Sequence, residues 1–419
     1  MARAMKDSGI EWIGEIPEGW EVARVSSCFS EVKEKNTDNL YDNALQFKMG
    51  RIIPKPRKWD AEEIGETYSA YTIVHPGTIM VNGLNLEFDF VTQRVAIVEE
   101  DGIITSAYIA MRPNGSVDAD YMCYLLKAYD YRRALHNMGK GLRKILNYSE
   151  LKTKPILLPT LPEQKSIVKA LNAECARIDA VIEQTRASIE EYKKLKQSVI
   201  TQAVTKGIRP GRKMKDSGVE WIDLIPETWK ECRIKNVIFP VQRPVNDNDD
   251  IITCFRDGVV TLRKNRREDG FTVSFTENGY QGVEPGDLVI HGMDAFAGAI
   301  GCSDSRGKTT PVVHVCKTSG NNRYFMYYLR CMAYGNILMD LSNGVRIRSS
   351  DFRNFAKLGV FKAVVPPESE QAEIVEYLDW ITVRIDELAH EKEHLLDELE
   401  SYKKSLIYEY VTGKKEVPV

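Results

Sequence analysis

Clusters of lysine and arginine are the residues of this chain whose types and spacing could do chemistry. Both side chains pair with phosphate groups, and arginine can also donate two hydrogen bonds to one guanine base. The candidate nucleic-acid contacts in the first half are Arg51, Lys55, Arg57, Lys58, Lys140, Arg143 and Lys144. Those in the second half are Arg263, Lys264, Arg266, Arg267, Arg306, Lys308, Arg346 and Arg348. The alternative is that these clusters are ordinary solvated faces.

No catalytic motif is complete. The segment from Gly301 to Gly307 has five residues between its glycines, whereas a phosphate-binding loop needs four. Val365-Pro-Pro-Glu368 lacks both the Asn or Asp and the aromatic residue of an adenine methyltransferase loop. The histidines have no nucleophile that could complete a catalytic set. We therefore expect no catalysis and no bound cofactor in this chain.

Composition favours a folded protein of two or three domains. The chain has 419 residues, 43% of them hydrophobic, and a formal net charge of −3. This net charge does not by itself indicate a nucleic-acid partner. No apolar run is long enough for a membrane helix and no signal peptide is evident, so we expect a cytoplasmic protein without membrane contact. The eight cysteines form no Cys-x-x-Cys pair, which argues against a metal site and against a disulfide framework.

The elements that must position these residues begin with a long repeat. Gln164 and Gln371 are 207 positions apart, and the same offset relates residues 163–205 to 370–412. Apolar positions recur at alternating steps of four and three, which is the seam of a coiled coil, and include Leu171, Ile178, Ile182, Ile189, Leu378, Ile385, Leu396 and Leu399. Each copy is predicted as one helix, roughly 65 Å long, that begins just after Pro162 or Pro367. A helix packed only on its own domain is the alternative, but two matching seams favour mutual packing.

Charge predicts the direction of that packing. Lys196 and Lys403 occupy equivalent seam positions. A parallel pair in register would place them ~5 Å apart, with a repulsion of ~3 kcal/mol at an effective dielectric constant of 20. We therefore predict an antiparallel coiled coil.

A second repeat precedes each long intervening region. MKDSGIEWIGEIPEGW at residues 5–20 and MKDSGVEWIDLIPETW at 214–229 share twelve of sixteen positions. Trp12, Trp20, Trp221 and Trp229 are the predicted anchors, through ring burial and an indole hydrogen bond. By symmetry, residues 5–20 should dock beside Tyr410 and Val411, which would close a pseudo-two-fold ring without a covalent bond.

The regions 21–155 and 230–365 share a skeleton although their sequences diverge. HPGTIMV from His75 aligns with EPGDLVI from Glu284, and each predicts a Pro-Gly turn into a strand. Tyr121 and Tyr324 each open an amphipathic segment typical of a helix. We predict two α+β domains of like topology. The predicted segments are 1–155 (repeat and domain), 156–210 (helix), 211–365 (repeat and domain) and 366–419 (helix).

This arrangement resembles the specificity subunit of type I restriction-modification systems. The most specific features are the helix entries LPTLPEQKSIV and VPPESEQAEIV, the helix ends and the Ser-Gly-x-Glu-Trp-Ile repeat. The resemblance implies a DNA-binding subunit with two target recognition domains, each reading one half of a split double-stranded site, on a coiled-coil spacer. It also implies as partners two modification subunits that use S-adenosylmethionine and two restriction subunits that use ATP and Mg²⁺.

A different class of protein also fits the pattern. Two protein-binding domains on a helical spacer would form an interaction scaffold without nucleic acid. A self-contained methyltransferase lacks its motifs here. The sequence leaves open which bases are read and the register of the helix pair.

Overall fold

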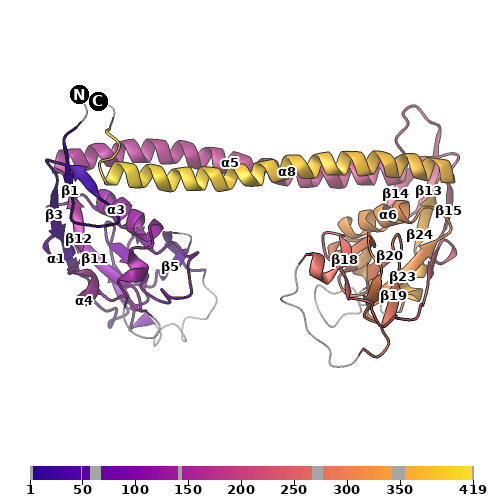
Figure 1. Cartoon of the computed structure of the whole chain (residues 1–419), viewed down its shortest axis with the longest axis horizontal. Coiled ribbons are helices and arrows are strands. Elements are labelled where there is room, and N and C mark those ends of the chain that lie inside the picture. Colours follow the sequence, from indigo (N-terminus) through magenta and orange to yellow (C-terminus); the bar gives the residue numbers. More distant parts are fainter. Residues whose placement is uncertain are drawn as a thin grey trace. The chain divides into compact units, whose positions relative to one another are not determined.

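The computed structural model describes residues 3–48, 50–56, 68–139, 144–266, 277–341 and 354–417. Contacts divide the chain into two compact units (Figure 1), one of residues 1–185 with 394–419 and the other of residues 186–393. Each unit contains one mixed domain and part of both long helices. The units thus combine segments that lie far apart in the sequence, whereas the predicted segments follow the order of the chain.

The domain of unit 1 is built on an antiparallel sheet. Its strand order is β4 (Phe29–Glu31), β11 (Ile109–Pro113), β8 (Ile79–Val81) and β9 (Val95–Ile97). Smaller pairs are β1 (Met5–Asp7) with β2 (Glu15–Pro17), β3 (Glu21–Arg24) with β12 (Pro155–Leu158), β5 (Leu45–Lys48) with β6 (Arg51–Pro54), and β7 (Thr72–Val74) with β10 (Gly102–Ile104). The helices are α1 (Val25–Cys28), α3 (Ala119–Tyr131) and α4 (Tyr148–Leu151).

The domain of unit 2 repeats this topology. Its four-stranded sheet has the order β16 (Ile238–Pro240), β23 (Val313–Thr318), β20 (Leu288–His291) and β21 (Ile300–Cys302). The smaller pairs are β13 (Met214–Val219) with β14 (Ile222–Pro226), β15 (Lys230–Arg233) with β24 (Lys362–Val365), β17 (Ile252–Cys254) with β18 (Val260–Leu262), and β19 (Gln281–Val283) with β22 (Gly307–Thr309). The helices are α6 (Asn322–Tyr334) and α7 (Ala356–Gly359). The predicted common topology is confirmed, and so are the two Pro-Gly turns, where Gly77 and Gly286 have φ of 85° and 82°.

The two long helices are α5 (Leu161–Lys206) and α8 (Glu368–Val411). Pro367 precedes α8 as predicted, whereas Pro162 lies inside the first turn of α5. An N–H at that position would have no acceptor within the helix, so proline is tolerated there. The predicted seam is buried in each unit. Buried seam residues are Leu171, Ile178 and Ile182 in unit 1, and Ile189, Leu378 and Ile385 in unit 2. Leu396 and Leu399 are half-buried and pack against the core of unit 1.

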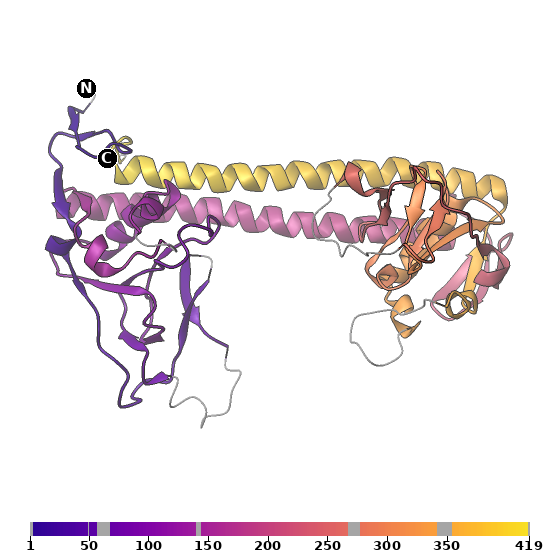
Figure 2. The ribbon, with the colours of Figure 1, turned by 60° about the horizontal axis from the view of Figure 1, so that its bottom comes forward.

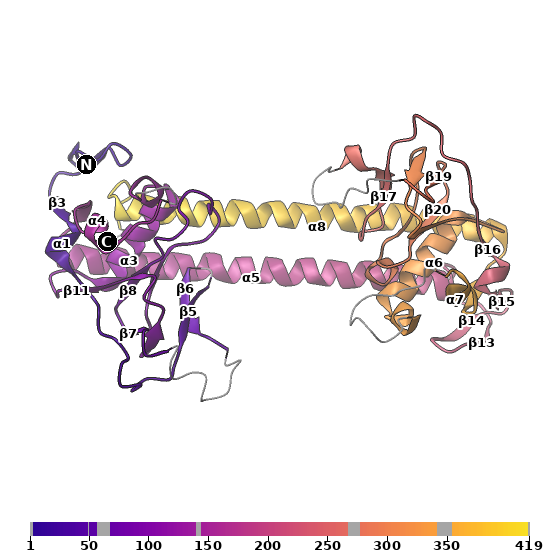
Figure 3. The same ribbon diagram turned by 90° about the horizontal axis from the view of Figure 1, so that it is seen from below.

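Within each unit, α5 and α8 lie side by side and run antiparallel (Figures 2 and 3). In unit 1, Lys403 Nζ lies 2.6 Å and 2.7 Å from the two carboxylate oxygens of Asp179. In unit 2, Lys196 Nζ lies 2.6 Å and 2.8 Å from those of Asp386. Asp179 and Asp386 are themselves repeat partners. The predicted direction is confirmed, and each seam lysine has an acidic partner on the opposite helix.

A glutamine joins the start of each long helix to its domain. Gln164 accepts a hydrogen bond from the Asp118 N–H (2.8 Å) and donates one to the Pro159 carbonyl (2.9 Å). Gln371 accepts from the Asn321 N–H (2.9 Å) and donates to the Pro366 carbonyl (2.9 Å). Asp118 and Asn321 are the N-caps of α3 and α6, so the glutamine of the Pro-x-x-x-Glu-Gln entry connects two helices and a strand end.

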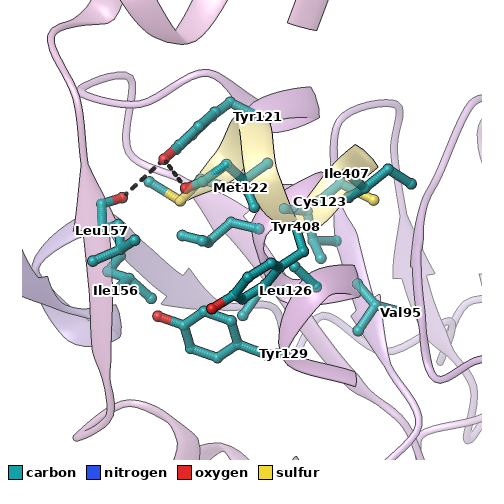
Figure 4. Packing of buried hydrophobic residues seen from close by; sticks show 14 of the residues in the cluster. Val95, Tyr121, Met122, Cys123, Leu126, Tyr129, Ile156, Leu157, Ile407 and Tyr408 are labelled. Atoms are coloured by element: carbon teal, nitrogen blue, oxygen red, sulfur yellow. Dashed lines mark hydrogen bonds between the residues drawn. The ribbon is translucent and has the colours of Figure 1, made fainter. Parts of the chain in front are cut away.

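A tyrosine joins the other end of each long helix to the domain. The Tyr121 hydroxyl donates to the carbonyls of Val411 (3.2 Å) and Leu157 (3.5 Å), within the core drawn in Figure 4. The Tyr324 hydroxyl donates to the carbonyls of Val204 (3.1 Å) and Val364 (3.0 Å). Burial raises the pKa of both phenols well above the ordinary value.

The first short repeat docks where symmetry predicts. Tyr408 donates a hydrogen bond to the Trp12 carbonyl (3.3 Å), and Lys414 Nζ donates to the Ile13 carbonyl (2.7 Å). Gly413 follows α8 with φ of 71°, and a Cβ there would lie 2.3 Å from Pro17 Cγ. The end of α8 and residues 5–20 thus form one packed structure without a covalent bond.

Trp20 and Trp221 anchor the short repeats by burial rather than by indole hydrogen bonding. Trp20 and Trp229 are fully buried, and Trp12 and Trp221 are half-buried. The indole N–H groups of Trp20 and Trp221 are buried without a hydrogen-bond acceptor among the described residues. The predicted indole hydrogen bond is therefore wrong for these two. The Trp12 ring instead packs edge-on against Tyr129, with centroids 4.6 Å apart.

Replacing the anchoring glutamine should destabilise unit 1. Gln164→Leu keeps the volume but leaves a partly buried N–H and a buried carbonyl unpaired, so the free energy of unfolding should fall by roughly 2–4 kcal/mol. Gln197→Leu, at an exposed site of the same helix, should change it by less than about 0.5 kcal/mol. Urea titrations of both variants would measure the difference. Equal effects would show that the glutamine does not carry the joint.

The ion pairs across the helices should couple energetically. Lys403→Asp places two carboxylates together and should cost roughly 0.5–1 kcal/mol, because the pair is partly exposed. Combining it with Asp179→Lys should restore most of the loss. A double-mutant cycle on unfolding free energies measures the coupling, and additive effects of the two changes would contradict it.

Candidate nucleic-acid interface

The β5–β6 hairpin of unit 1 carries two of the predicted cations. Arg51 begins β6 opposite Lys48, and Gly50 between them has φ of 70°. Lys55 follows β6, and its N–H donates to the Ala44 carbonyl at 2.7 Å. Both side chains are exposed, and neither forms an ion pair with another described residue. They are available to contact an anionic partner.

The β17–β18 hairpin places Arg263 at the matching site of unit 2. Arg263 follows β18, and its N–H donates to the Ile251 carbonyl at 2.8 Å. Its guanidinium Nε donates to Thr253 Oγ at 3.2 Å. Lys55 and Arg263 are thus structurally equivalent, a match that sequence alignment did not reveal.

Residues 249–251 gather further predicted cations in unit 2. Arg306 donates to both carboxylate oxygens of Asp249 (3.1 Å and 3.2 Å) and also pairs with Glu284. Lys264 pairs with Asp250, whose carbonyl accepts the Lys308 N–H at 2.9 Å. The hydrogen bonds from Arg306 lower the pKa of Asp249 below its ordinary value. Arg306 is therefore a structural tie as much as a surface charge.

Two more predicted cations of unit 2 also face acids. Lys308 Nζ lies 2.7 Å from Glu277, and Arg266 pairs with Asp257 while lying 4.5 Å over the Phe255 ring. Burial alone would raise the pKa of Asp257, but hydrogen bonds from Arg266 and the Val259 N–H, together with the positive charges of Arg266 and Arg330, lower this pKa below its ordinary value. Ion pairs at the surface are worth only about 0–1 kcal/mol. A phosphate could therefore displace such a carboxylate.

The remaining predicted contacts divide into two groups. Arg57, Lys58, Lys140, Arg143, Arg267, Arg346 and Arg348 lie outside the described residues. Lys144 is exposed, has φ of 38°, and its carbonyl accepts the Leu86 N–H at 3.3 Å. The structure therefore brings Lys264, Arg306 and Lys308 together in unit 2, whereas Lys144 borders a different loop from Arg51 and Lys55.

Two arginines of unit 1 that were not among the predicted contacts have notable environments. Arg94 is fully buried and holds a loop through backbone carbonyls, so it is unavailable to a ligand. Arg133 is exposed, has φ of 57°, and lies 5.0 Å over the Phe90 ring. The adjacent pair Arg132-Arg133 was a visible signal for the second of these. Nothing local in the sequence marks the burial of the first.

The described part of the chain shows neither a cluster of metal ligands nor a helix that could cross a membrane. All eight cysteines are free, and six are buried, as expected for small apolar side chains.

Releasing cations from their acids tests whether unit 2 binds phosphate through them. Asp250→Asn with Asp257→Asn frees Lys264 and Arg266 and should strengthen binding to duplex DNA roughly two- to fivefold per pair. The dependence of log K on log salt should also steepen by about one per added phosphate contact. Fluorescence anisotropy at several salt concentrations measures both quantities. Asp247→Asn is a control for net charge, since this exposed acid pairs with no described residue. If the double variant behaved as this control does, Lys264 and Arg266 would be excluded as phosphate contacts.

Known proteins resemble this chain over most of its length. It is 25% identical over 426 residues to a provisionally named type I restriction enzyme MjaX specificity subunit of Methanocaldococcus jannaschii, covering 96% of this chain and 95% of that one. It is also 25% identical to the MjaVIII specificity subunit of the same organism, over 53% of this chain and 50% of that one. No family model matches the sequence.

A solved structure shows the same fold. That chain comes from work on complex assembly and conformational transition of the type I restriction-modification system, and it aligns with a TM-score of 0.67 at 15% identity, over 96% of this chain and 99% of that one. This chain is therefore similar to the specificity subunit of a type I restriction enzyme in sequence over almost its whole length, and it shares the fold of a chain from a type I restriction-modification system, as its repeats predicted.

Proposed function

We propose that this chain is the DNA-recognition and assembly subunit of a type I restriction-modification complex. The observation that carries the proposal is similarity to a specificity subunit along 96% of the chain, which includes both domains and both helices. The two domains share a topology but carry different surface residues. Each domain would therefore read a different half of a split double-stranded site.

The chemistry of the complex would belong to its partners. Two modification subunits would methylate adenine N6 with S-adenosylmethionine, and two restriction subunits would use ATP and Mg²⁺ to translocate and cleave DNA. This chain would bind no cofactor and would catalyse no step. It would act in the cytoplasm, where its DNA substrate lies.

Methylome sequencing is the direct test of this proposal. Cells that carry the chain with its modification subunit should methylate one bipartite sequence, and cells that lack either protein should not. Purified chain should bind duplex DNA with a marked salt dependence, since phosphate contacts release counterions. An interaction scaffold would show neither result. Methylation by the chain without a partner would overturn the non-catalytic role.

Specificity should be modular between the domains. Replacing residues 21–155 with another recognition domain should change one half-site and leave the other half-site unchanged, because the two units have separate cores. The methylated motif before and after the exchange measures this. As a control, the native residues 21–155 inserted through the same junctions as the foreign domain should leave both half-sites unchanged. A change in both half-sites would contradict independent reading.

A further inference from the structure

The loop between β8 and β9, residues 82–94, presents an apolar tip to solvent. Its Phe88, Phe90 and Val91 side chains are 74%, 53% and 92% exposed. The corresponding loop of unit 2, residues 292–299, is shorter, and its Phe296 is half-buried. Exposure of several large apolar side chains together usually marks a binding site. This tip belongs to the first domain alone.

The buried Arg94 side chain holds the loop in one conformation through hydrogen bonds. Its fully buried guanidinium donates hydrogen bonds to the carbonyls of Leu84 and Asp89, each at 2.6 Å, and to that of Asn82 at 3.2 Å. The Arg94 N–H donates to Asp130 on α3 at 2.7 Å. The loop is thus ordered before any ligand arrives, so binding at its tip does not incur that entropy cost.

Phe90 of the tip is stacked on a neighbouring ring, whereas Phe88 and Val91 are exposed to solvent. Phe90 lies parallel to the His136 ring, with centroids 5.3 Å apart, and the Arg133 guanidinium lies 5.0 Å from the Phe90 centroid. The Asp89 carboxylate accepts the N–H groups of Val91 (3.1 Å) and Thr92 (2.9 Å), which shapes the turn. Hydrogen bonding from Thr92 lowers the pKa of Asp89, so this acid is already engaged. The Phe88 and Val91 side chains remain exposed.

The surroundings of the tip favour DNA over protein as its ligand. The loop is bonded to the segment that carries the exposed Lys144, through Leu86 N–H to the Lys144 carbonyl (3.3 Å) and Leu146 N–H to the Gly83 carbonyl (2.9 Å). Arg133 adds a second exposed cation beside the tip. Three side chains are far too few for a stable protein interface, which buries about 800 Å² per partner. They suit insertion between two base pairs, with cations left to meet the phosphates.

We propose that Phe88 and Val91 form an apolar wedge that enters one base step of the half-site read by the first domain and partly unstacks it. This inference rests on the proposed function, because it needs duplex DNA as the ligand. It adds a mode of recognition, since flexible pyrimidine–purine steps open more readily than others and would be preferred at that position. The second domain, which lacks the tip, reads its half-site without such an opening.

Fluorescence of 2-aminopurine tests the wedge. The duplexes would contain the target sequence found by methylome sequencing. Domain exchange shows which half-site the first domain reads, and the probe would be placed at each successive base step of that half-site. Binding of the full chain should raise fluorescence at one step. Phe88→Ala with Val91→Ala should abolish that rise and weaken binding roughly tenfold. Leu40→Ala, which removes an equally exposed apolar side chain from the same unit, should change neither.

The outcomes separate the wedge from the proposed function. If wild-type protein fails to bind the duplex, the DNA-binding function fails with it. If it binds without raising fluorescence at any step, or if the double variant behaves as the Leu40→Ala control, the wedge is overturned and DNA recognition stands. Normal DNA binding with loss of the modification subunit would identify the tip as a protein contact and would also overturn the wedge. Equal thermal unfolding of the variants establishes that the fold is kept.

Discussion

Each unit depends on a buried tyrosine hydroxyl that meets the last turn of a long helix. The final carbonyls of a helix have no partner within it and need one from elsewhere. Tyr121 supplies a donor to Val411, and Tyr324 supplies one to Val204. The same hydroxyls also bond Leu157 and Val364, each on the strand that leads into the other long helix of that unit. One side chain therefore joins the domain, its exit strand and a helix from a distant part of the sequence.

The repeat follows from this joint. A domain whose core includes the end of a helix from the other half of the chain cannot complete that core alone, and this is true of both domains. The glutamines at the helix starts add a second joint made of the same atoms in both copies. Both joints use backbone carbonyls and N–H groups, so they place few demands on the rest of the domain. The remaining surface could then diverge, as a reader of varied DNA sequences requires.

The two surfaces differ in how they hold their charge. The described cations of the β5–β6 hairpin face solvent without acidic partners among the described residues, whereas Lys264, Arg266, Arg306 and Lys308 are held by carboxylates. The first surface can meet phosphate directly. On the second surface a phosphate must replace a carboxylate that already holds the cation. Binding there would depend more on how well the phosphate fits the site than on net charge. Domains of one topology can in this way differ in selectivity as well as in sequence.

Local pattern was enough to predict the duplication, the two long helices, their seam and the common domain skeleton, since periodicity and repeats are properties of neighbouring residues. Like charge at Lys196 and Lys403 was enough to predict the antiparallel direction. Their partners Asp386 and Asp179 were visible only in the structure, because a partner on another helix depends on register. The same holds for Lys55 and Arg263, which match through backbone hydrogen bonds and not through aligned sequence. Arg94 is the clearest case. A lone arginine in a loop reads as a surface charge, and only the closure of that loop around its guanidinium buries it.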